Sequence, residues 1–213
     1  MVIADLSPVS RVSAATTQSP RHRIGRMDPH IEGFLLQLTS VSQDLPGIAG
    51  HTSREQFNWR PSSEKWSIGQ CVEHLNITTE RYLPVLRQEM TNARSAQKLA
   101  SGPFALGFFE RWFLGYMEPP PRHKSRTGKA FVAPPDLDPA TTIDRFNRLQ
   151  GEFGECIRSA VGLDLKRIKV RSQFGPVSWT LNATFAILLA HQRRHIWQAR
   201  QVRTDAAFPT KAS

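Results

Sequence analysis

Helical periodicity in four long segments is the feature that most limits what this 213-residue chain can fold into. In each segment, apolar residues recur every three or four positions, which places them along one face of an α-helix. The segments begin after Asp28, Ser67 and Asp138, and at Ser178. Because hardly any stretch shows the alternation of a strand, we expect an all-α protein built as a four-helix bundle.

Short sequence signals mark the starts of these helices. Asp28 and Asp138 are each followed by proline, the pattern of an N-cap residue with proline at the first helical position. Ser67 is followed three residues later by Gln70, and Ser53 by Gln56, and both pairs match a capping box. The sequence therefore predicts three long helices with defined starts and one short helical turn between the first two.

The ends of the helices are marked less clearly. The first helix is expected to end near Pro46, the third near Gly162 and the fourth near Arg203. Pro84 should kink the second helix or force a local repair of its hydrogen bonds. A brief extended piece is expected from 168 to 174.

Composition divides the chain into an arm, a bundle and a tail. Residues 1–27 are rich in Ser, Thr and Arg and are expected to be a disordered arm. Residues 28–205 form the expected bundle, and residues 206–213 a tail. Within the bundle, residues 103–117 are aromatic and predict a short irregular helix over one end of the core. Residues 118–139 are proline-rich and predict a long structured loop.

The net charge of +10 raises the question of a nucleic-acid partner. Most of the excess lies outside the predicted helices. The first 26 residues hold four arginines and one aspartate, and residues 119–135 hold four basic residues and no acid. Because no known nucleic-acid-binding motif is present, the charge instead suggests an anionic small-molecule substrate or contact with a membrane surface.

The two cysteines, Cys71 and Cys156, make no disulfide framework and no C-x-x-C pair. A reduced, cytoplasmic protein is therefore expected. The first 26 residues lack the apolar core of a signal peptide, and no apolar run is long enough to span a membrane.

Three of the seven histidines have positions that suggest metal binding. His191 and His195 are four residues apart, so they share one face of the most apolar helix and can converge on one ion. His74 lies at the flank of the second helix, where it can face the gap between helices. An exposed or singly hydrogen-bonded histidine pair is the alternative interpretation.

Other residues near these histidines have more than one interpretation. Cys71 is either a soft metal ligand or a small core residue. Glu73 adjoins His74 in sequence but points about 100° away on the helix. Gln198 is either a hydrogen-bonding partner of His195 or a solvated side chain. No residue is assigned as a catalytic base.

Two further groups could contribute to a substrate site. Aromatic side chains could roof a pocket or simply pack in the core, and basic side chains of the proline-rich loop could contact an anion or remain solvated. The aromatic group is Phe104, Phe108, Phe109, Trp112, Phe113 and Tyr116, and the basic group is Arg122, His123, Lys124, Arg126 and Lys129.

Three pieces of sequence resemble the DinB-like superfamily. They are Trp59-Arg60-Pro61 with Lys65-Trp66-Ser67-Ile68-Gly69-Gln70 and Glu73-His74-Leu75, then Phe174-Gly175-Pro176-Val177-Ser178, and finally His191-Gln192-Arg193-Arg194-His195-Ile196-Trp197-Gln198. The resemblance implies a four-helix bundle with up-down-down-up topology. It also implies that His74, His191 and His195 bind a divalent metal, zinc or nickel.

The resemblance implies a class of chemistry without fixing the reaction. Some members of the family couple a low-molecular-weight thiol to an electrophile, and others are hydrolases or isomerases. The leading hypothesis is therefore a metal-dependent enzyme acting as a thiol S-transferase or a small-molecule hydrolase. The alternatives are a non-catalytic metal-binding protein and a basic helical protein that binds nucleic acid. A homodimer is also consistent with the resemblance.

Overall fold

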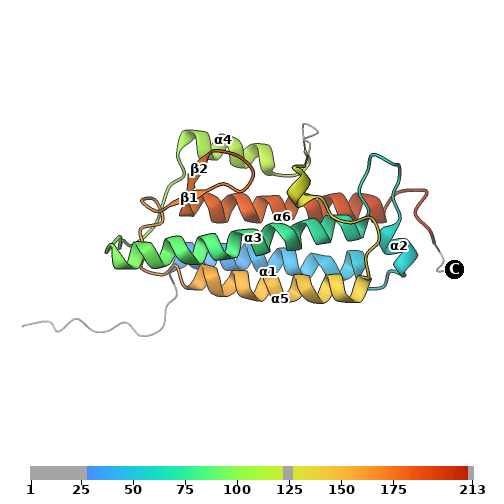
Figure 1. Ribbon diagram of the computed structural model, residues 1–213, viewed down its shortest axis with the longest axis horizontal. Coiled ribbons are helices and arrows are strands. Elements are labelled where there is room, and N and C mark those ends of the chain that lie inside the picture. Colours follow the sequence, from blue (N-terminus) through green and yellow to red (C-terminus); the bar gives the residue numbers. More distant parts are fainter. Residues whose placement is uncertain (1–27, 122–126, 211–213) are drawn as a thin grey trace, which may run out of the picture.

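Four long helices form the body of the protein in a computed structural model that describes residues 28–121 and 127–210 (Figure 1). They are α1 (Pro29–Ala49), α3 (Ile68–Ser95), α5 (Pro139–Arg158) and α6 (Leu181–Arg203). Helices α3 and α5 pack side by side, and α1 and α6 each contact two of the other helices. The predicted arm (1–27), part of the loop and the end of the tail lie outside the described residues.

The direction of the chain gives the topology (Figure 1). Helices α1 and α6 run one way along the bundle, and α3 and α5 run the opposite way. Since α3 and α5 are parallel neighbours, the segment between them must return along the full length of the bundle. The expected all-α bundle with up-down-down-up topology is therefore confirmed.

The predicted helix starts are present with their capping interactions. The Asp28 carboxylate accepts a hydrogen bond from the backbone N–H of His30 at 2.8 Å, and Pro29 occupies the first turn. Ser67 and Gln70 form a complete capping box. The Asp138 carboxylate accepts from the backbone N–H of Thr141 at 2.8 Å. These bonds satisfy backbone donors that a helix N-terminus otherwise leaves unpaired.

The helices continue through their internal prolines. Helix α1 runs past the expected end at Pro46 to Ala49, and α3 runs through Pro84, where a kink or local repair was expected, to Ser95. In α1 the residues on both sides of Pro46, including Leu45 and Ile48, are buried, and this packing outweighs the hydrogen bond that proline removes. Helix α5 ends at Arg158, a turn before the expected end.

The start of the last helix is also corrected. Residues Ser178–Thr180 form strand β2, which pairs in antiparallel fashion with β1 (Lys169–Arg171), and α6 begins only at Leu181. Thr180 caps the helix by accepting from the backbone N–H of Ala183 at 3.1 Å. The short hairpin replaces the single extended piece expected from the sequence.

Three short elements lie on the bundle: α2 (Arg54–Asn58), α4 (Phe108–Met117) and the 3-10 turn η1 (Lys129–Phe131). Helix α4 covers most of the aromatic segment 103–117 and packs along the outside of α6, at the end of the bundle that carries the β1–β2 hairpin (Figure 1). Within the described residues, no helix is long and apolar enough to span a membrane.

The buried side chains fall into two large apolar clusters at different levels of the bundle. Along α6, Leu181, Phe185 and Leu189 belong to one cluster, and Ile196, Ala199 and Val202 belong to the other. Polar side chains are buried between them, including Gln150 and Gln192, whose amides pair at 3.2 Å. The predicted metal-binding histidines lie in this polar layer.

Candidate metal centre

The structure brings the three predicted histidines together between α3 and α6. Their candidate ligand nitrogens all lie within 4.8 Å of one another, and Nε2 of His74 is 3.1 Å from Nε2 of His191. His74, His191 and His195 are 3%, 5% and 8% exposed. The alternative of an exposed histidine pair is therefore excluded, while binding of a metal stays a prediction.

Hydrogen bonds hold two of the rings in the orientation that a metal site needs. His74 Nδ1 donates to the backbone carbonyl of Phe131 at 2.7 Å, because a carbonyl oxygen can only accept. His195 Nδ1 donates to Oε1 of Gln198 at 3.1 Å. With the proton held on Nδ1, each ring presents the lone pair of Nε2 to the centre of the cluster.

All three imidazoles are kept in their neutral form at neutral pH. Burial lowers the pKa of His74, and a weaker opposing effect comes from its hydrogen bond to Phe131. Burial lowers the pKa of His191 and His195 well below the ordinary value, and the neighbouring histidines and Arg194 lower them further. Neutral imidazole is the form that binds a metal ion.

The cluster fits a divalent metal ion on its own geometry. Two nitrogens bound to one zinc ion at tetrahedral angles lie about 3.3 Å apart. The 3.1 Å between His74 Nε2 and His191 Nε2 is close to that value. Before an ion binds, the same 3.1 Å contact is a hydrogen bond in which His191 Nε2–H donates to His74 Nε2. Imidazole nitrogen suits zinc and nickel.

Aromatic rings enclose the three histidines. Trp66 stacks on His195 with ring centroids 5.4 Å apart and an interplanar angle of 18°, and it packs against His74 in an edge-to-face arrangement with centroids 5.0 Å apart. Phe174, in the loop between β1 and β2, lies 5.4 Å from the His191 ring and 4.8 Å from Phe131. This apolar wall lowers the local dielectric around the site.

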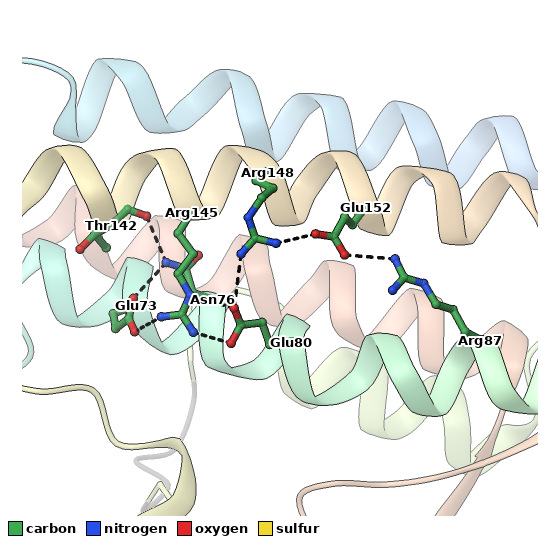
Figure 2. A network of polar contacts seen from close by, with 8 residues as sticks. All are labelled: Glu73, Asn76, Glu80, Arg87, Thr142, Arg145, Arg148 and Glu152. Carbon is green, nitrogen blue, oxygen red and sulfur yellow. Dashed lines mark hydrogen bonds and ion pairs between the residues drawn. The ribbon is translucent and has the colours of Figure 1, made fainter.

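Glu73 does not belong to the site, as its position on the helix predicts. Its carboxylate forms an ion pair with Arg145 of α5 and accepts a hydrogen bond from Asn76 at 3.0 Å (Figure 2). Arg145 also pairs with Glu80, and the chain of charges continues along α3 and α5 (Figure 2). Glu73 is thus held between the two parallel helices and is not assigned to the chemistry of the site.

Several other predicted candidates lie away from the histidines. Cys71 is buried in an apolar cluster, where burial raises the pKa of its thiol, so it is a core residue. Of the predicted aromatic group, Phe104 packs against the main core and Phe113 against Trp179, whereas Phe108 is 81% exposed, so the group neither packs nor covers a pocket as one unit. Of the basic loop residues, only the exposed Lys129 falls within the described residues.

Sequence reasoning missed three contributors to the site. The Phe131 carbonyl comes from the proline-rich loop, and no residue type can signal a backbone contact. Phe174 reaches the site through the hairpin that was not predicted. Trp66, directly before the N-cap Ser67, was noted as part of a motif, and its place eight residues, or about two turns, before His74 was the available signal.

Together, the fold and the cluster define a helical-bundle protein with a candidate metal centre buried between two of its helices. The sequence profile of the DinB superfamily matches residues 37–199, and the chain belongs to this family. The family inferred from the motifs is therefore confirmed. No curated protein matches the sequence significantly.

Among solved structures, the chain is similar to YfiT from Bacillus subtilis. That protein is described as a probable metal-dependent hydrolase with an unusual four-helix bundle topology. The two share 16% sequence identity and a TM-score of 0.54, and the match covers 86% of this chain and 90% of YfiT. At this identity the similarity establishes the fold.

Proposed function

We propose that the protein is a metal-dependent enzyme that hydrolyses a small molecule at a divalent ion held by His74, His191 and His195. The observation that carries the proposal is the convergence of three buried, neutral imidazoles, two of them fixed through Nδ1. The similar structure of YfiT, described as a probable metal-dependent hydrolase, supports the same chemistry.

Each residue of the site has a defined task in this proposal. The three histidines supply ligand nitrogens, and three protein ligands leave a coordination position for water or substrate. A divalent ion there supplies Lewis acidity. The Phe131 carbonyl and Gln198 keep two ligand rings in the correct tautomer, and Trp66 limits the access of bulk water.

A thiol S-transferase is the second candidate, and the structure restricts how it would work. Both cysteines are buried, and burial raises the pKa of Cys156 to about 11, so neither thiol is ionised at neutral pH. The reacting thiol would have to be a separate small molecule that binds at the open coordination position. Zinc and nickel are the expected metals for either reaction.

The test compares metal content and activity in matched variants. Wild-type protein is expected to hold about one zinc or nickel ion per chain after loading and desalting, whereas His191→Ala loses the ion. His51→Ala, which changes an exposed histidine outside the site, serves as the control. Loaded protein is then assayed with esters and amides, and with electrophiles plus a small thiol. Equal, negligible metal in all three proteins would overturn the proposal.

A further inference from the structure

Three buried side-chain atoms have no hydrogen-bonding partner among the described residues: Oδ1 of Asn76, the hydroxyl oxygen of Thr78 and Nδ1 of His191. His191 belongs to the candidate metal centre, and Thr78 follows His74 by one turn of α3. These two residues are 5% and 2% exposed. A buried polar group without a partner is unfavourable, so the unpaired atoms of His191 and Thr78 call for an explanation.

His191 is the exception among the three histidines. The other two donate through Nδ1 to a fixed acceptor, the Phe131 carbonyl and Gln198 Oε1. A metal-binding histidine normally has such an outer partner, which fixes its tautomer and the orientation of its ring. The site is therefore complete for His74 and His195 but lacks one outer partner for His191.

The Thr78 hydroxyl does not donate to its own helix. Several other hydroxyl residues, both exposed and buried, donate to the backbone carbonyl one turn earlier in their helix. These residues are Thr39, Ser42, Thr91, Thr184 and Thr204. Because Thr78 makes no such bond, its hydroxyl is available to a group outside its own helix.

The contacts of its neighbours place Thr78 on the face of α3 that meets His191. His74, Thr78 and Tyr82 follow one another at four-residue spacing, which brings them onto the same side of the helix. His74 contacts His191 directly, and Tyr82 contacts Phe174 with ring centroids 5.7 Å apart. Phe174 in turn lies against His191. Thr78 therefore lies, along the helix, between His74, which contacts His191, and Tyr82, which contacts the Phe174 ring that packs on His191.

We propose that Thr78 is the positioning residue of His191, with its hydroxyl linked to His191 Nδ1 through one buried water molecule. A hydroxyl both donates and accepts, so it can pair with Nδ1 whether that atom carries the proton or not. A water that joins two otherwise unpaired buried groups is a regular part of protein interiors. The inference rests on the proposed function, because it treats His191 as a metal ligand.

The test uses three variants of the full chain. Thr78→Val replaces the hydroxyl by a methyl group of the same shape, Thr78→Ser keeps the hydroxyl, and Thr79→Val makes the same change at a neighbouring buried threonine on another face. Zinc affinity, measured by competition with a chelator, should fall about tenfold in Thr78→Val, the loss typical of an outer partner. The two other variants should bind zinc like the wild type.

A second readout separates this inference from the proposed function. In metal-free protein, the nitrogen-15 signals of the His191 ring should shift in Thr78→Val, while those of His74 and His195 stay in place.

The outcomes are distinct for the two proposals. If wild-type protein binds no metal, the proposed function fails, and the His191 signals still decide whether Thr78 contacts that ring. Unchanged His191 signals in Thr78→Val would overturn the positioning role. Wild-type zinc affinity in Thr78→Val, or an equal loss in Thr79→Val, would overturn it as well.

Discussion

Acidification should destabilise the metal-free protein because its three clustered histidines are buried in their neutral form. Burial lowers the pKa of all three, most strongly for His191 and His195. In the unfolded chain the same side chains have their ordinary pKa of about 6.5. Below this pH the unfolded state binds more protons than the folded state, so the free energy of unfolding falls as the pH falls.

The size of the effect follows from the number of protons. For a histidine that stays neutral in the folded protein, lowering the pH from 7 to 5.5 costs about 1 kcal/mol. His191 and His195 together should therefore lower the free energy of unfolding by roughly 2–3 kcal/mol over this interval, and His74 adds to the loss. Above pH 7 these residues should contribute almost no pH dependence.

Urea unfolding of metal-free protein between pH 5 and 8 measures this effect. His191→Gln should have a shallower decline below pH 6.5, because one buried histidine no longer resists protonation. His51→Gln, which changes an exposed histidine, should decline like the wild type. A wild-type stability that is constant from pH 7 to 5.5 would refute the argument that the cluster is buried and neutral.

Three further predictions concern the neighbours of the site and the core of the bundle. Arg145→Met should lower the free energy of unfolding by about 3 kcal/mol, because it leaves the buried Glu73 carboxylate without its cation, and adding Glu73→Gln should restore part of the loss in the same urea assay. No recovery in the double variant would contradict the ion-pair argument. Gln198→Leu should weaken zinc affinity about tenfold, because the Nδ1–H group of His195 loses its hydrogen-bond acceptor. Chelator competition measures this affinity, and an unchanged value would show that Gln198 does not support the site. Cys156 should react with a thiol reagent only after denaturation, because it is buried with a raised pKa, and rapid labelling of the native protein would contradict this burial.

Much of the bundle could be predicted from the sequence because its helices carry local signals. The capping residues Asp28, Ser67 and Asp138 indicate where three of the helices begin. The four-residue spacing of His191 and His195 predicts that both lie on one face of a helix. The ends were less predictable, since burial of residues beyond Pro46 depends on packing against other helices. Local patterns contain no information on such long-range contacts.

The site was predictable only in part for the same reason. The histidines are marked by spacing and by the family motif, but the Phe131 carbonyl reaches His74 over 57 residues of chain. The contact of Phe174 with His191 depends on the β1–β2 hairpin, whose strands are only three residues long. Strands so short leave too little alternation to detect.

X-ray absorption at the zinc edge of the loaded protein tests the central claim most directly, because it reports the ligands of the bound ion. We predict about one ion per chain, bound by three imidazole nitrogens at about 2.0–2.1 Å, with His191→Ala losing the ion. Zinc that is bound without imidazole ligands, or an identical spectrum in His191→Ala, would contradict a metal centre formed by His74, His191 and His195.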